Sequence, residues 1–382
     1  MGLRVLVAPQ EFKGSLTAIE AATAIADGVR DALGPDASIR ELPLGDGGPG
    51  TVDACFAASE AERVTVEVTG PMGERRSADY ALIGDGDDLS AVIESSAACG
   101  LVLTLPAERR PGLATSRGVG ELVEDALKRG ARRIVVGVGG TGTNDGGAGA
   151  ARALGLELSD RAGLPIPEGV LGLHRLVGSE GASVLPMFGE AELRIAVDVM
   201  NPLLGIEGAT AVYGPQKGVR DWELPAFDGA LAHWAAAVER DFGLSLADLP
   251  GVGAGGGLPA GLLAAAHAAG VTAAIESGAA LVADMVGLRT ALVDADVVVT
   301  GEGSIDAQTG YGKTVAFVAD LAAEFTCPTL AVGGVVTAQP PAVADTEASS
   351  PDGVGAEGAM ALGGAPVRSA AERLVRRWLA KR

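Results

Sequence analysis

The sequence predicts an α/β fold in which mainly parallel strands are covered by helices. An apolar run at 3–8 reads as a buried strand, and a polar loop and a capped helix with apolar residues at helical spacing follow it. The same order of strand, loop and helix recurs after apolar runs at 133–138, 193–199 and 296–300. Repeated units of this kind build a parallel sheet with helices on its faces.

The middle of the chain predicts a second domain. Residues 63–94 read as three strands separated by turns, which is typical of antiparallel pairing. Because the first and last strand–helix units look alike, we expect a Rossmann- or flavodoxin-like parallel-sheet domain from both chain ends, 1–62 plus 284–382. An inserted mixed α/β domain is expected at 63–283. Residues 338–366 are rich in Pro, Gly, Ala and Ser and predict a flexible linker.

Composition excludes several classes of function. The net charge of −20 argues against a nucleic-acid partner or an anionic membrane surface, because both would repel the chain. No run of 18 apolar residues and no signal-peptide pattern is present, so a cytoplasmic location is expected. The three cysteines lack a CxxC pair and the three histidines lie outside polar clusters, which indicates neither a zinc site nor a Ser-His-Asp triad. Any chemistry is therefore expected to depend on carboxylates and lysines.

Polar, glycine-rich segments follow the predicted strands at five places. Ligands of α/β proteins gather outside the carboxyl ends of the strands, so these segments are the candidate site. They are PQEFKGS at 9–15, GDGGPGT at 45–51, GGTGTNDGG at 139–147, Asp198 with GPQKG at 214–218, and TGEGSID at 300–306 with Lys313.

Each segment has a functional and an ordinary interpretation. Lys13 could bind a phosphate or a carboxylate, or be a solvated lysine beside a helix cap. Asp46 suits a hard cation but also a plain turn, and Asp198 suits a general base but also a cap. Taken together, Lys13, Lys217 and Lys313 with these carboxylates supply what phosphoryl transfer needs: cations for phosphates, ligands for magnesium and a base.

A dinucleotide fingerprint offers a rival interpretation. Gly137, Gly139 and Gly142 match GxGxxG, which would suit a nicotinamide dehydrogenase. Chance matches are expected in a chain with 57 glycines. Asn144 and Asp145 at the mouth of the following helix suit a metal and a phosphate better than a pyrophosphate alone.

Together these segments resemble the type I glycerate kinase family. The similarity is nearly collinear from about 3 to 334, and its carriers include APQEFKGSLTA, PLGDGGPGT, ESSAACGL, TSRGVGELV, GVGGTGTNDGGAGAARALG, DVMNPLLG, GPQKG and TGEGSIDAQTGYGK. The resemblance implies ATP-dependent phosphorylation of D-glycerate, at the 2-hydroxyl, by a two-domain α/β protein with a cleft between its domains. A monomer or a homodimer is expected.

This resemblance leads to a hypothesis about the site. Lys13 and Lys313 would act with Asp198 in catalysis, with Asp198 accepting the proton of the attacking hydroxyl. Asp46, Glu302 and Asp306 would bind Mg²⁺. ATP would be bound by a larger set: Gly139, Gly140, Thr141, Thr143, Asn144, Asp145, Lys217, Gly301, Glu302 and Gly303.

The chain departs from the family pattern at three places. Gln10 and Glu11 stand where the family usually reads Asp-Ser, and Pro49 replaces a glutamate. Past Gly334 the family's late strand is not evident. These differences leave two alternatives open: a non-catalytic relative that binds glycerate or nucleotide, and a kinase for a related small hydroxy acid.

Overall fold

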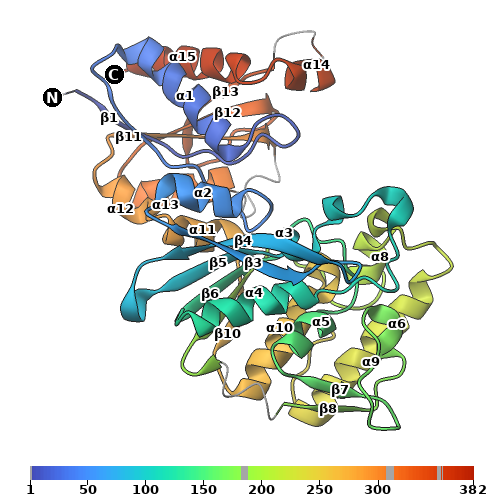
Figure 1. Ribbon diagram of the computed structural model, residues 1–382. Coiled ribbons are helices and arrows are strands. Elements are labelled where there is room, and N and C mark those ends of the chain that lie inside the picture. The colour runs from blue at the N-terminus through green and yellow to red at the C-terminus, as the bar shows by residue number, and fades with distance from the viewer. Residues whose placement is uncertain (1, 182–187, 307–313, 351–353, 355) are drawn as a thin grey trace. The chain divides into compact units, whose positions relative to one another are not determined.

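The chain forms two compact units. The computed structural model describes residues 2–181, 188–306, 314–350, 354 and 356–382. Unit 1 contains Met1–Asp46, Gly50–Ser59 and Ala279–Arg382, and unit 2 contains Gly47–Pro49 and Glu60–Gly278 (Figure 1). The sequence predicts domain boundaries after residues 62 and 283.

Unit 1 contains a parallel sheet, which confirms the predicted fold class. Its five strands lie in the order β13-β12-β11-β1-β2, and every neighbouring pair is parallel. The chain passes from β1 to β2 on one side and from β11 to β12 and β13 on the other, so the direction of winding reverses between β1 and β11. The strands are β1 (Arg4–Val7), β2 (Ser38–Glu41), β11 (Val297–Ile305), β12 (Thr329–Val336) and β13 (Val343–Ala348).

The helices of unit 1 hold both chain ends on this sheet. Figure 1 shows the first and last long helices, α1 and α15, side by side. A Cβ added at Gly28 of α1 would lie 2.2 Å from the carbonyl oxygen of Arg368 in α15, so only glycine allows this approach. The helices are α1 (Ala18–Leu33), α2 (Thr51–Ala58), α11 (Gly278–Met285), α12 (Leu288–Val293), α13 (Thr314–Glu324), α14 (Ala356–Ala361) and α15 (Ala365–Leu379).

The segment 338–366 differs from the flexible linker that the sequence predicts. In its described part, β13 pairs in parallel with β12, and α14 follows. The composition of the segment did not predict this strand, because β13 lies at the sheet edge and carries Asp345 and Glu347 instead of an apolar run. Arg377 of α15 donates hydrogen bonds to both carboxylates, which fixes the strand against the last helix.

Unit 2 contains a six-stranded mixed sheet in the order β10-β9-β6-β5-β4-β3. The strands β3, β4 and β5 are antiparallel, as predicted for 63–94, whereas β5, β6, β9 and β10 are parallel. A separate antiparallel pair is formed by β7 (Glu157–Ser159) and β8 (Gly178–Glu180). The main strands are β3 (Glu62–Thr69), β4 (Arg75–Ile83), β5 (Ser90–Glu94), β6 (Arg133–Gly137), β9 (Glu192–Ala196) and β10 (Ala273–Glu276).

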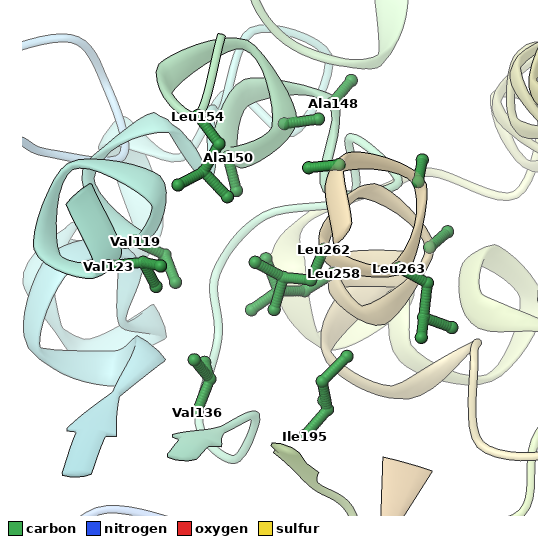
Figure 2. Packing of buried hydrophobic residues seen from close by; sticks show 14 of the residues in the cluster. Val119, Val123, Val136, Ala148, Ala150, Leu154, Ile195, Leu258, Leu262 and Leu263 are labelled. Atoms are coloured by element: carbon green, nitrogen blue, oxygen red, sulfur yellow. The ribbon is translucent and has the colours of Figure 1, made fainter. Parts of the chain in front are cut away.

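Aliphatic side chains make up most of the core of unit 2. Figure 2 shows the buried side chains of α4, α5 and α10 above Val136 of β6 and Ile195 of β9. A Cβ added at Gly120 of α4 would lie 2.3 Å from the carbonyl oxygen of Ala150 in α5, so these helices also approach through glycine. The helices are α3 (Ser95–Cys99), α4 (Arg117–Lys128), α5 (Ala148–Ala153), α6 (Val170–Leu173), α8 (Ala209–Tyr213), α9 (Leu224–Phe242) and α10 (Ala254–Ala269).

Among the described residues, no helix combines the length and the apolar character that crossing a bilayer requires.

Candidate active site

The side chain of Gln10 joins three segments at the carboxyl edge of the unit 1 sheet. Its Nε2 donates to Asp46 Oδ2 at 2.5 Å, and its Oε1 accepts from Thr314 Oγ1 at 2.7 Å. Gln10 follows β1, Asp46 follows β2 and Thr314 begins α13. This junction lies where the winding of the sheet reverses, which is the usual ligand position in such folds.

Charged side chains surround this junction. Burial raises the pKa of the Glu11 carboxyl, the negative charge of Asp46 raises it further, and the positive charge of Lys13 lowers it. The side chain of Lys13 is exposed, and those of Glu11 and Asp46 are half-buried. We call Gln10, Glu11, Lys13, Asp46 and Thr314 the switch-point cluster.

The predicted loop at 300–306 is largely strand. β11 extends to Ile305, so Gly301, Glu302 and Gly303 lie within the sheet and not in a loop after it. A Cβ added at Gly301 would lie 2.5 Å from the carbonyl oxygen of Val332, which explains the glycine by packing. Glu302 is buried, and Asp306 follows the strand half-buried.

The predicted metal ligands do not form a compact cluster. Among the residues that the structure describes, no three His, Cys, Asp or Glu side chains are grouped so that they could hold a metal ion. Asp46, Glu302 and Asp306 all belong to unit 1. Lys313, the predicted catalytic lysine, lies outside the described residues.

In unit 2, the carboxylate of Asp145 is part of the fold. It is 1% exposed and accepts four hydrogen bonds, from the backbone N–H groups of Ser116, Gly147 and Gly149 and from Ser116 Oγ. Burial raises the pKa of Asp145, and the bonds from Ser116 act in the opposite direction. Asp145 thus satisfies amides at the starts of both α4 and α5, a role that leaves it turned away from solvent.

Most other polar groups of the 139–147 loop are also used internally. Thr141, Thr143 and Asn144 are buried, and Asn144 Nδ2 donates to Thr210 Oγ1 at 2.9 Å. The N–H of Gly139 donates to the carbonyl of Gly47 and that of Gly142 to Cys99, while the carbonyl of Gly140 accepts from Leu101. The sequence predicts that these groups contact ATP, but the structure leaves mainly Gly140 exposed.

The glycines of the GxGxxG match are explained by packing. A Cβ added at Gly137 would lie 2.1 Å from the carbonyl oxygen of Gly47, and one at Gly139 would lie 2.5 Å from Gly48 Cα. The segment Gly47–Pro49 therefore lies directly on the carboxyl end of β6. In a dinucleotide fingerprint, the glycines leave space for a pyrophosphate. Here the space beside Gly137 and Gly139 is filled by the segment Gly47–Pro49.

Lys217 is buried beneath the same loop. It ends the short 3₁₀ helix η4 (Pro215–Lys217), and its Nζ donates to the carbonyl oxygen of Thr143 at 2.6 Å. The sequence predicts a lysine that contacts ATP phosphates, whereas the structure places this ammonium in the core of unit 2.

Asp198 lies two residues beyond β9 and is exposed. Its Oδ1 accepts from the N–H of Gly278 at 2.9 Å and from Ser277 Oγ at 3.2 Å, at the start of α11. The sequence leaves a general base and a cap open for this residue. The hydrogen bonds from Gly278 and Ser277 are compatible with both roles, because they orient the carboxylate and leave the side chain exposed.

Sequence reasoning missed several polar residues at the carboxyl end of β5. Ser96 Oγ donates to Glu94 Oε2 at 3.1 Å, and a Cβ added at Gly140 would lie 3.4 Å from Ser96 Cβ. Ser95 Oγ is buried and has no hydrogen-bond partner among the described residues. The motif ESSAACGL carried the signal, because it places a carboxylate and two hydroxyls directly after an apolar strand.

Comparisons with known proteins agree on one family. Residues 5–379 match the model of the glycerate kinase family. A glycerate kinase of Halalkalibacterium halodurans is 42% identical over 330 residues, which are 86% of this chain and 85% of that protein. A glycerate 2-kinase of Escherichia coli K12 is 39% identical over 336 residues, covering 88% of this chain and 86% of the other.

A solved structure shares the whole fold. The crystal structure of a Salmonella typhimurium LT2 chain assigned as glycerate kinase 2 superposes with a TM-score of 0.86 at 39% identity. The alignment covers 100% of this chain and 99% of that chain.

Proposed function

This chain belongs to the glycerate kinase family, and on that premise we propose that it transfers the γ-phosphoryl group of ATP to D-glycerate and forms 2-phosphoglycerate. The observation that supports this most is the match along nearly the whole chain to the family model and to relatives named glycerate kinase and glycerate 2-kinase. The choice of the 2-hydroxyl follows the relative named glycerate 2-kinase.

We assign the chemistry of unit 1 to the switch-point cluster. Lys13 supplies an exposed ammonium at the carboxyl edge of the sheet, where it can bind a phosphate or the carboxylate of glycerate. Gln10 holds the Asp46 carboxylate in place through the bond from its amide, so that Asp46 can meet a ligand in one orientation.

The oxygen ligands present fit Mg²⁺. Magnesium commonly uses one or two carboxylates together with substrate phosphates and water, so a preformed group of three carboxylates is not required. Asp46 and Asp306, both half-buried in unit 1, would hold it. When bound, the ion supplies positive charge that offsets the negative charge developing on the transferred phosphoryl group.

Asp198 remains the proposed base. The N–H of Gly278 and the hydroxyl of Ser277 orient its carboxylate, and its exposure leaves an oxygen accessible to a substrate hydroxyl. A base held in this way can accept the proton as the oxygen attacks phosphorus.

The first test is ADP release with ATP, Mg²⁺ and D-glycerate, with NMR identification of the product. The expected product is 2-phosphoglycerate. Asp198→Asn should lower kcat by about 100-fold, the low end of the range for general bases. Asp228→Asn is the matched control, because Asp228 also accepts a backbone N–H, that of Gly205, in unit 2.

Other outcomes would redirect the assignment. Wild-type turnover by Asp198→Asn would remove Asp198 as the base. ATP-dependent thermal stabilisation without ADP release would favour the non-catalytic relative. ADP release with a different small hydroxy acid, and none with D-glycerate, would change the substrate and keep the kinase.

A further inference from the structure

The ammonium of Lys217 is enclosed by the fold. The residue is 2% exposed, and its Nζ donates to the carbonyl oxygen of Thr143 at 2.6 Å and contacts Thr141 Oγ1 at 3.5 Å. From the other side of the turn, Arg109 donates to the carbonyl oxygen of Gln216 at 3.0 Å. The ammonium is therefore not exposed to a ligand, and the loop residue Thr143 is its closest hydrogen-bond partner.

The neighbouring backbone is shaped to admit this ammonium. A Cβ added at Gly256 would lie 2.7 Å from Lys217 Nζ and 2.0 Å from the carbonyl oxygen of Thr143. Gly256 also has φ +78°, a conformation that favours glycine. Lys217, Gly256 and Thr143 therefore form one close-packed contact in which only glycine leaves room for the lysine.

Two titratable groups face the ammonium. The Cys99 thiol is neutral because burial raises its pKa to about 12, and the Asp145 carboxyl interacts with Lys217 favourably. Burial nevertheless lowers the pKa of Lys217 to about 8. The protonated form is thus disfavoured by its surroundings, and an apolar side chain of similar volume would avoid this desolvation.

We propose that Lys217 is a positioning residue whose ammonium holds the Thr141–Thr143 backbone in the conformation that phosphoryl transfer requires. The proposal rests on the proposed kinase function. Its physical basis is that a charge-assisted bond to a backbone carbonyl fixes the loop more firmly than a neutral contact does. The exposed Gly140 precedes the clamped residues directly, so its position follows theirs.

Activity and stability should respond to pH in opposite directions. The pKa of Lys217 in the folded chain, about 8, lies below its ordinary value of 10.5. The unfolded chain therefore binds this proton more tightly between these pH values, and the contribution of Lys217 to stability rises with pH. Loss of the same proton weakens the clamp, so kcat should fall above about pH 8.

The decisive variant is Lys217→Met. We expect kcat to fall by about 100-fold, with a smaller change in KM for ATP, because misplacement of reacting groups by about 1 Å has effects of this size. The melting temperature should be unchanged or higher, and the decline of kcat above about pH 8 should disappear. Lys128→Met is the control, since Lys128 is an exposed lysine of unit 2 paired with Glu124.

Hydrogen exchange tests the clamp without turnover. In Lys217→Met, amides of peptides covering 139–147 should exchange about tenfold faster, as expected for local opening, while peptides from α15 stay unchanged. Hydrogen exchange tests the contact between Lys217 and the loop even if the wild type is not a kinase. Failure of the proposed function would instead appear as a wild type that releases no ADP.

Several results would overturn the proposal. The first is a Lys217→Met variant whose kcat, pH profile and hydrogen exchange equal those of the wild type. The second is faster hydrogen exchange throughout unit 2, which would indicate that Lys217 stabilises the unit in general. If the variant does not fold, the wild type decides the question. Constant kcat from pH 7 to 9.5 would then refute the clamp, and a fall near pH 8 without a lower melting temperature would support it.

Discussion

The glycine-rich loop of unit 2 and the switch-point cluster of unit 1 look alike in sequence and differ in the structure. The loop follows β6, while Gln10, Glu11 and Lys13 of the cluster follow β1, and both regions carry carboxylates and hydroxyls. In the loop, Asp145 and Thr143 are buried and serve the fold. In the cluster, Lys13 is exposed, and Asp46 is half-buried and accepts a hydrogen bond from the amide of Gln10.

Polar residues that follow a strand can therefore differ in burial and in role. The 139–147 loop is covered within its own unit by the glycines at the start of α10, and a Cβ at Gly256 or Gly257 would collide with it. A covered loop must satisfy its polar groups internally, since an unpaired buried group is costly. Substitutions that remove a buried acceptor of the loop should therefore lower stability, and substitutions in the cluster should lower activity with little change in stability.

The largest expected effect is that of Asp145→Ala in the loop. It leaves backbone N–H groups of Ser116, Gly147 and Gly149 without their acceptor inside the core. We expect the free energy of unfolding to fall by about 3–5 kcal/mol, as when a buried charged network is broken. Urea denaturation measures this, with the exposed Asp221→Ala as control. A loss of unfolding free energy below about 1 kcal/mol would contradict the structural role assigned to Asp145.

A smaller effect, on activity, is expected for Gln10→Glu in the cluster. The new carboxylate would face Asp46 and repel it, where the amide of Gln10 now donates at 2.5 Å. We expect kcat to fall about tenfold and stability to change by less than about 1 kcal/mol, because the site is half-buried. Gln339→Glu makes the same chemical change at an exposed side chain elsewhere in unit 1 and is the control. Unchanged kcat, or a loss of stability like that of Asp145→Ala, would contradict the assignment.

The smallest effect is expected for Asp345→Asn at the edge of unit 1. Arg377 and Lys381 lower the pKa of Asp345 from 3.8 to about 2. Because the folded pKa is the lower one, the stabilisation is complete above about pH 4 and is lost as the pH falls to about 2. Partial exposure of Arg377 reduces the effect, so we expect a loss of about 0.5–1 kcal/mol at pH 7.

Denaturation of the wild type and Asp345→Asn at pH 7 and pH 3 checks this sign. The difference between the two proteins should shrink at pH 3. A difference that is constant with pH would mean that the amide disturbs packing and that the charge contributes little. Asp85→Asn, at an exposed turn, is the control.

Periodicity along the chain predicted most of the fold. The runs at 3–8 and 133–138 form β1 and β6, and the change to antiparallel pairing falls at 63–94 as expected. β13 escaped prediction because an edge strand needs few apolar residues and this one carries charges that pair with α15. The end of β11 was placed too early because Gly301 and Gly303 look like a loop in sequence.

The sequence by itself determined the fold class and the family, because strand and helix periodicity and collinear motifs are properties of neighbouring residues. Only the tertiary structure decided which polar residues of those motifs are buried. Lys217 meets the Thr143 carbonyl across 74 residues of sequence, and Gln10 meets Thr314 across 304. Burial and partnership depend on such distant contacts, so the same kind of motif yields a buried clamp in unit 2 and an accessible cluster in unit 1.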